Sequence, residues 1–235
     1  MQPSTRALCT VLAVSLLAQS ACRRQSSTSS GTTPRAAPGT ERVPESLAMG
    51  GAKSRMTFFV TGVGLGNGGD LGGLAGADAH CQALATAEGS GDHTWRAYLS
   101  AAATPTGPAV NARDRIGRGP WYNAEAELVA ANVGALHGSG NRLSAETALT
   151  QKGDSAGRDV LTGSTPEGTA FDARDDRTCG NWTSTIDRHA QVGHADRQSD
   201  EHGGGSWNSS HLSSGCRPQD LSREGGGRFY CFGID

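Results

Sequence analysis

The sequence predicts one α+β domain of short strands, long loops and an early helix, held together by two disulfides. Of the 235 residues, 34 are glycine and only 35% are hydrophobic. This composition is typical of short elements joined by many turns and not of tightly packed helices. Strand-like patterns stand at the beginning and end of the part of the chain that shows periodicity, with a helical pattern soon after the first. An even number of cysteines in the same part indicates disulfide pairs.

The N-terminus has the pattern of a secretory signal peptide. The apolar run at 7–18 follows a positive charge, is too short to span a bilayer and ends in small residues. Residues 17–22, Leu-Ala-Gln-Ser-Ala-Cys, resemble a bacterial lipobox, although Gln19 stands where an aliphatic residue is usual. We therefore expect a signal peptide at 1–21 and lipidation of Cys22, with simple secretion as the alternative.

The segment that follows this cysteine predicts a tether. Residues 22–54 are rich in Ser, Thr, Pro, Gly and Ala and show no apolar periodicity, which is typical of a disordered linker. It would hold a folded domain at 55–235 away from a bacterial outer membrane or cell surface. The net charge of −2 gives no attraction to nucleic acid or to an anionic bilayer. We expect membrane contact through the lipid alone and no nucleic-acid partner.

The six cysteines divide by position. Cys9 lies in the leader and Cys22 in the lipobox-like segment. In an exported chain the remaining four predict two disulfides; they are Cys81, Cys179, Cys216 and Cys231. Because no cysteine or histidine pair has the spacing of a zinc finger, we expect no structural metal.

The folded region begins with a strand at 56–61 and a glycine-rich loop at 62–73. Small and apolar residues then recur at three- and four-residue spacings over 75–88, which predicts a helix with Cys81 on its inner face. Alternation predicts a second strand at 95–100.

The middle of the chain is less regular. Residues 121–136 fit either a helix through 124–131 or a strand and a loop. The remaining predictions are a short strand and turn at 159–163, loops at 165–177 and 198–206, a strand at 179–184 and a final strand at 228–234.

Several short motifs in a fixed order carry a resemblance to a known family. They are Leu-Gly-Gly-Leu-Ala-Gly-Ala-Asp-Ala-His-Cys at 71–81, Trp-Arg-Ala-Tyr-Leu-Ser at 95–100, Gly-Arg-Asp-Val-Leu at 157–161, Cys-Gly-Asn-Trp-Thr at 179–183, and Gly215-Cys216 with Phe-Tyr-Cys-Phe at 229–232. In this order the chain resembles, over about residues 56–235, the endostatin-like branch of the C-type-lectin-like fold as it occurs in bacterial surface proteins. The resemblance implies short antiparallel sheets and nested disulfides, Cys81–Cys231 outside and Cys179–Cys216 inside.

Sugar-binding members of the wider family hold calcium with a Glu-Pro-Asn or Gln-Pro-Asp loop and a Trp-Asn-Asp strand, since calcium takes several oxygen ligands. Here Asn208 follows a tryptophan but precedes Ser209, and neither proline motif occurs. Asp196, Asp200 and Glu201 stand nearby in sequence as replacement ligands, with solvated loop charges as the alternative. We expect no cofactor; the alternative is a bound calcium ion.

Histidines gather in the same part of the chain. A zinc or nickel site can be built from such residues, but no pair has a helical spacing, and exposed loop histidines are the favoured interpretation. The residues are His189, His194, His202 and His211, with Asp187, Asp196 and Asp200 among them.

Arginines form a further candidate binding site. Endostatin-like domains bind sulfated glycans through arginines, whose guanidinium groups pair with two oxygens at once. The candidates are Arg113, Arg115 and Arg118, with Arg96 as the one that matches the family pattern. The alternative is a solvated charged loop, because acidic residues lie in the same stretch.

No nucleophile and base stand in a recognisable pattern, so we expect no catalytic residues and no enzyme. The predicted function is a cell-surface binding module that recognises a glycan or a surface protein through the loops at 163–177 and 187–206. Trp121 and Trp207 are aromatic candidates for stacking on a sugar, with burial in the core as the alternative. A structural or adhesive lipoprotein without a small ligand, or an enzyme on the same scaffold, are the competing hypotheses.

Replacing Cys22 with serine is expected to release the protein from membranes, because the acyl chains that provide membrane affinity are attached through this thiol. The measurement is the partition of the protein between detergent-rich and aqueous phases after expression in a Gram-negative host. Cys9→Ser, inside the leader, is the matched control and should leave the partition unchanged. A Cys22→Ser protein that stays in the detergent phase would show that another segment anchors it.

Overall fold

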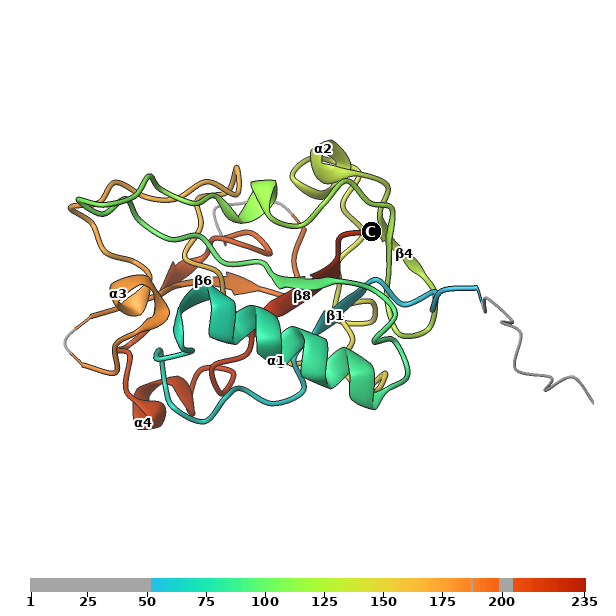
Figure 1. Ribbon diagram of the computed structural model, residues 1–235, viewed down its shortest axis with the longest axis horizontal. Helices are drawn as coiled ribbons and strands as arrows, with labels where there is room; N and C mark the ends of the chain where they lie inside the picture. The colour runs from blue at the N-terminus through green and yellow to red at the C-terminus, as the bar shows by residue number, and fades with distance from the viewer. Residues whose placement is uncertain (1–51, 187, 199–204) are drawn as a thin grey trace, which may run out of the picture. The chain divides into compact units, whose positions relative to one another are not determined.

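Two small antiparallel sheets and one long helix form the frame of the domain (Figure 1). The computed structural model describes residues 52–186, 188–198 and 205–235. The predicted signal peptide, the lipidation at Cys22 and nearly all of the tether lie outside these residues, as do Asp187, Asp200, Glu201 and His202. Within the described residues, no helix has the length and apolar character needed to cross a membrane.

The first sheet places the last strand of the chain between the first two. Its order is β1 (Phe58–Val60), β8 (Tyr230–Gly233) and β2 (Trp95–Ala97), with both pairings antiparallel. In β8, Cys231 lies opposite Phe59 on one side and Ala97 on the other. The three strand predictions at these positions are confirmed with shorter bounds, and the two ends of the domain meet in one sheet.

The helix α1 (Gly73–Ala87) lies across the face of this sheet (Figure 1). Its buried residues include Ala77, Cys81 and Ala85, which are four residues apart and therefore form one stripe. The chain enters through Gly72 with a φ of 72° and leaves through Gly89 with a φ of 76°, a backbone conformation that glycine adopts without steric cost. The predicted helix at 75–88 is confirmed.

The second sheet has the order β5 (Asp159–Leu161), β6 (Gln191–His194) and β7 (His211–Leu212), also antiparallel. Its first strand, β5, is hydrogen-bonded to the segment just before β8, since the Leu161 backbone N–H donates to the Arg228 carbonyl at 2.8 Å. The segment that leads into β8 therefore also supports the second sheet.

Residues 121–136 follow the strand-and-loop alternative. A hairpin of β3 (Trp121–Tyr122) and β4 (Leu128–Ala130) takes the place of the helix through 124–131. The Asn123 side-chain oxygen accepts hydrogen bonds from the backbone N–H groups of Glu125 and Glu127 at 3.0 and 2.9 Å. This local turn competes with a helix for the same N–H groups. Three one-turn elements complete the description: η1 (Ala112–Asp114), α2 (Val133–Leu136) and α4 (Pro218–Leu221).

The predicted strand at 179–184 is wrong, because α3 (Cys179–Trp182) is a left-handed turn. Its four residues have φ values of 49°, 66°, 56° and 65°, which cost non-glycine residues conformational energy. Tertiary contacts hold it: Trp182 is buried and its ring N–H donates to the Ser100 carbonyl at 2.7 Å. The Thr178 hydroxyl accepts from the backbone N–H of Asn181 at 3.0 Å.

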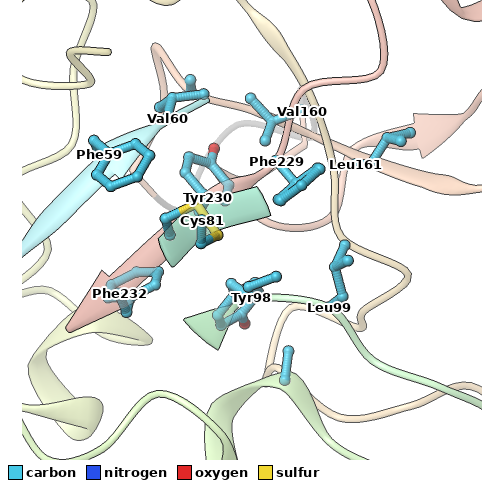
Figure 2. Close-up of a cluster of buried hydrophobic side chains, with 14 of the residues drawn as sticks. Phe59, Val60, Cys81, Tyr98, Leu99, Val160, Leu161, Phe229, Tyr230 and Phe232 are labelled. Atoms are coloured by element: carbon cyan, nitrogen blue, oxygen red, sulfur yellow. A yellow bond between two sulfur atoms is a disulfide. The ribbon is translucent and has the colours of Figure 1, made fainter. Parts of the chain in front are cut away.

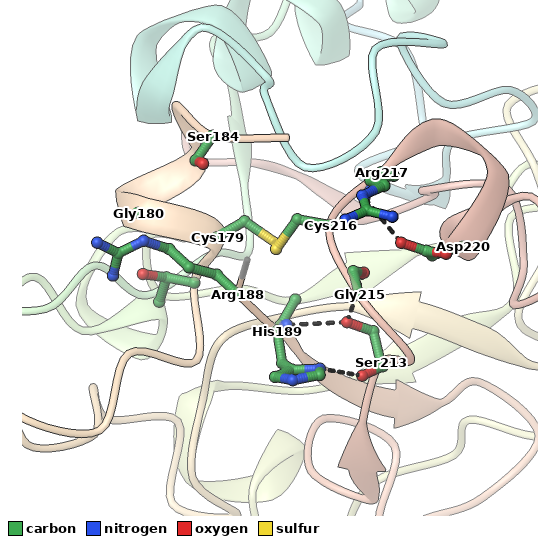
Figure 3. Close-up of a disulfide and its surroundings, with 12 residues drawn as sticks. Cys179, Gly180, Ser184, Arg188, His189, Ser213, Gly215, Cys216, Arg217 and Asp220 are labelled. Carbon is green, nitrogen blue, oxygen red and sulfur yellow. Dashed lines mark hydrogen bonds between the residues drawn. A yellow bond between two sulfur atoms is a disulfide. The ribbon is translucent and has the colours of Figure 1, made fainter. Parts of the chain in front are cut away.

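Both disulfides have the nested pairing that the resemblance implied. Cys81–Cys231 joins α1 to β8 inside the core, with Cα atoms 5.6 Å apart (Figure 2). Cys179–Cys216 joins α3 to the segment before α4, with Cα atoms 5.8 Å apart (Figure 3). Such bonds are typical of proteins that fold in oxidising compartments.

The core around these elements is rich in aromatic rings (Figure 2). Every tryptophan is buried, none more than 2% exposed, and they are Trp95, Trp121, Trp182 and Trp207. Trp121 and Trp207 are therefore core residues and do not offer a free face to a sugar. Within the described residues, every buried side-chain nitrogen and oxygen has a hydrogen-bond partner, as is usual for native interiors.

Removing either disulfide is expected to lower the free energy of unfolding, with the larger loss for Cys81–Cys231. The closed loops span 150 and 37 residues, which in the chain-entropy model correspond to at most about 5 and 4 kcal/mol. Each pair is replaced by alanines, and urea unfolding is followed by tryptophan fluorescence. A double variant at Cys179 and Cys216 that loses more than the one at Cys81 and Cys231 would contradict this order.

Candidate functional site

A polar groove lies beside the C-terminal end of α1. Two adjoining hollows of about 450 and 440 Å³ share Glu88, Gln151, Lys152 and Asp154. We call the combined depression the polar groove and define it by these four residues with Arg55 and Glu125, which line the first hollow. Its volume is in the range of clefts that hold small ligands.

A tight turn presents the charged side chains of one wall. The Thr150 hydroxyl accepts from the backbone N–H groups of Lys152 and Asp154 at 3.3 and 3.2 Å. The turn is attached to the edge of β1, because the Val60 N–H donates to the Leu149 carbonyl at 2.9 Å. Lys152 and Asp154 are exposed, so a sheet edge holds their backbone while their side chains face solvent.

The floor of the groove is fixed by buried polar contacts. Gln151 is only 6% exposed, and its side-chain oxygen accepts from the Gly62 N–H at 2.9 Å. Arg228 donates to the Gly62 carbonyl at 3.2 Å and to the carbonyl of Ala156. These bonds join the loop after β1 to the segment before β8, and they leave little freedom for the floor to move.

The groove carries charges of both signs. Arg55 and Lys152 supply positive charge, and Glu88, Glu125 and Asp154 supply negative charge. These groups offer both donors and acceptors. The arrangement therefore suits an uncharged, hydroxyl-rich molecule better than a polyanion, which would meet the three carboxylates.

Two of the predicted binding arginines pair with a buried carboxylate. Arg115, with a side chain only 12% exposed, donates to both oxygens of Asp78 at 2.9 and 2.7 Å. Arg96 donates to the same carboxylate at 2.8 Å, and the Ala97 N–H donates to it at 2.9 Å. Asp78 thus fastens α1 to β2, and its single negative charge is shared between Arg96 and Arg115.

The other two arginines lie apart from this carboxylate cluster. Arg113 donates to the Glu167 carbonyl at 2.9 Å and so braces the loop at 163–177. Arg118 is exposed. Of the four predicted arginines, the structure brings Arg96 and Arg115 together, and it does so around an internal carboxylate.

Of the four calcium candidates, the structure describes Asn208 and Asp196. Asn208 is fully buried, and its side-chain nitrogen donates to the Tyr98 hydroxyl at 2.9 Å and to the carbonyls of Thr165 and Pro166 at 3.0 and 3.1 Å. Its side-chain oxygen accepts from the Ser206 hydroxyl. Asp196 is exposed, and the other two carboxylates of the set lie outside the described residues. Asn208 therefore ties the 163–177 loop to the core.

A tyrosine and a histidine stand at hydrogen-bond distance, as a catalytic pair would. The Tyr98 hydroxyl lies 2.7 Å from His137 Nε2. However, Tyr98 is completely buried, and burial raises its pKa far above the ordinary value, while burial lowers the pKa of His137. A Cβ atom at Gly168 would lie 2.3 Å from His137 Nε2, so the loop packs directly on the pair. Both residues belong to the core network that includes Asn208.

Three further ligand-type side chains meet on the second sheet. Asp159 Oδ1 lies 3.5 Å from His194 Nε2 and 3.9 Å from His211 Nε2. The sequence drew attention to both histidines but not to Asp159, because only the register of the strands brings them together. His189 lies elsewhere, with its Nδ1 2.7 Å from the Ser213 carbonyl (Figure 3).

Comparison with protein-family models and with curated proteins finds no match to this chain.

Replacing Asp78 with alanine is expected to destabilise the fold by about 3–5 kcal/mol, because it leaves the guanidinium of Arg115 buried without a counter-charge. Urea unfolding monitored by tryptophan fluorescence measures the change. Glu167→Ala, at an exposed loop position, is the control and should change the free energy of unfolding by about 0.5 kcal/mol or less. An Asp78→Ala protein as stable as this control would contradict the structural role of the cluster.

Proposed function

We propose that the protein is an exported, non-catalytic binding module whose polar groove recognises a glycan. The observation that carries this proposal is the pair of joined hollows of about 450 and 440 Å³, which share donors, acceptors and charges of both signs; the second also has apolar walls at Val63, Leu84 and Ala87. A glycan hydroxyl both donates and accepts hydrogen bonds, so such a lining can satisfy several hydroxyls of one sugar unit.

The groove would bind a sugar mainly through hydrogen bonds. Every tryptophan of the chain is buried, which leaves no indole face for stacking. A net hydrogen bond contributes about 0.5–1.5 kcal/mol, and one to a charged group about 1.5–3 kcal/mol. A single site is therefore weak, and many copies on one surface would raise the effective affinity for a repeating polysaccharide.

The proposed fold is the endostatin-like branch of the C-type-lectin-like fold. Three features support it: the pairing of the first and last strands, an early helix tied by a disulfide to the last strand, and a second disulfide nested inside the first. Long loops around a disulfide-closed core suit a recognition module.

The proposed location is the bacterial cell surface or outer membrane. Two disulfides favour an oxidising compartment outside the cytoplasm. The proposal that a lipid on Cys22 anchors the protein is inferred from the leader sequence. We propose no cofactor for glycan binding and no nucleic-acid partner.

The test is a glycan array with the purified protein, followed by calorimetric titration with the glycan that binds best. Glu88→Ala and Lys152→Ala are each expected to weaken binding about tenfold or more, because each removes a hydrogen bond to a charged group. Both side chains are exposed, so melting temperature and circular dichroism should remain unchanged.

Arg174→Ala is the matched control, because its side chain is 95% exposed in the 163–177 loop, which the sequence singled out as a recognition surface. It should bind as the unmodified protein does. If Arg174→Ala loses binding while both groove variants keep it, that loop is the recognition surface and the groove proposal is wrong. An array with no bound glycan would also overturn it and favour a protein partner or an adhesive role.

A further inference from the structure

The register of the second sheet places three ligand-type side chains on one face. Asp159 in β5 lies directly opposite His194 in β6, and His211 in β7 lies opposite Val192. Because alternate residues of a strand point to the same side, Val192 and His194 share a face. Asp159, His194 and His211 therefore all face the same side of the sheet, each from a different strand.

The distances match the needs of a small metal ion. One ligand atom from each residue lies within 4.8 Å of the other two, and Asp159 Oδ1 is 3.5 Å from His194 Nε2. A tetrahedral ion with bonds of about 2.0–2.1 Å holds its ligands about 3.4 Å apart. The Asp159–His194 pair already has this separation. His211 Nε2 lies 3.9 Å from Asp159 Oδ1, and the three ligand atoms lie within 4.8 Å of one another, so His211 has to approach by about 0.5–1.4 Å, which its 41% exposed side chain allows.

One residue of the present arrangement opposes the ion. The Arg158 guanidinium lies 3.1 Å from His194 Nδ1 and donates to it. When Nε2 binds a metal, Nδ1 carries the proton and cannot accept this bond. The Ser210 hydroxyl lies 3.0 Å from Nδ1 and 3.1 Å from Nε2, so it has to move away from Nε2 when the ion binds and can then accept the hydrogen bond of protonated Nδ1. Arg158 is 53% exposed and already lies 3.9 Å from Asp196, toward which it can turn.

We propose that Asp159, His194 and His211 form a binding site for a divalent transition-metal ion, with zinc as the best fit and water as the fourth ligand. Two imidazoles and one carboxylate suit zinc, nickel or copper, whereas calcium takes six to eight oxygen ligands. The ion would clamp β5, β6 and the two-residue edge strand β7 together. The site does not involve the polar groove, and it stands independently of glycan binding.

The test is calorimetric titration of the metal-free full chain with zinc alone, together with the melting temperature at increasing zinc. We expect saturable binding and a rise in melting temperature. His211→Ala, whose side chain is largely exposed, should weaken zinc binding at least tenfold without changing the melting temperature of the metal-free protein. His194→Ala should weaken it as much, but it also removes a buried ring.

Two further variants distinguish this site from adventitious binding to histidines. His80→Ala, on α1 outside the cluster, should leave the zinc affinity unchanged. Arg158→Ala should increase the affinity several-fold, because it removes a positive charge and a competing donor from His194. The proposal would be overturned if the unmodified chain bound no zinc at a zinc concentration of about 1 mM. Equal zinc affinities of the His211→Ala and unmodified proteins would also overturn it. A loss of affinity in Arg158→Ala would also contradict it.

Discussion

The disulfide between Cys81 and Cys231 is the constraint on which most of this structure depends. It joins the middle of α1 to the central strand of the first sheet, and both cysteines are fully buried. The strand β8 pairs with β1 on one side and β2 on the other, so one covalent bond fixes the helix, the start of the domain and its end relative to one another. In a chain with 34 glycines, such a cross-link lowers the entropy of the unfolded state by an amount that matters against the small net stability of a domain.

Polar side chains that look like binding residues serve this same frame. Asp78 accepts hydrogen bonds from Arg96, Arg115 and the Ala97 backbone, and Asn208 joins the 163–177 loop to Tyr98. Buried polar groups need partners, because leaving one unsatisfied costs about 1–3 kcal/mol. A short element that cannot bury much apolar surface is therefore positioned by specific hydrogen bonds, which explains why a small domain with long loops contains so many of them.

The two proposed sites both depend on backbone that strand pairing holds in place. The polar groove depends on a turn attached to the edge of β1. The Asp159–His194–His211 cluster depends on the pairing of three short strands. Both follow the same physical pattern, in which a rigid backbone positions buried and exposed side chains at little further cost in conformational entropy. They share no residue, so each can act or fail without the other.

The sequence by itself determined the elements whose signals are local: the helix with Cys81 inward, the first, second and last strands, and the presence of two disulfides. Their periodicity and composition depend on neighbours within a few residues. Only the tertiary structure decided the left-handed turn at Cys179–Trp182, because a disulfide and the buried Trp182 stabilise a backbone that local preference disfavours. The same holds for Asp159, which stands 35 and 52 residues before His194 and His211 in the chain. Strand register is set by pairing between distant segments, so no local pattern reveals which three side chains meet.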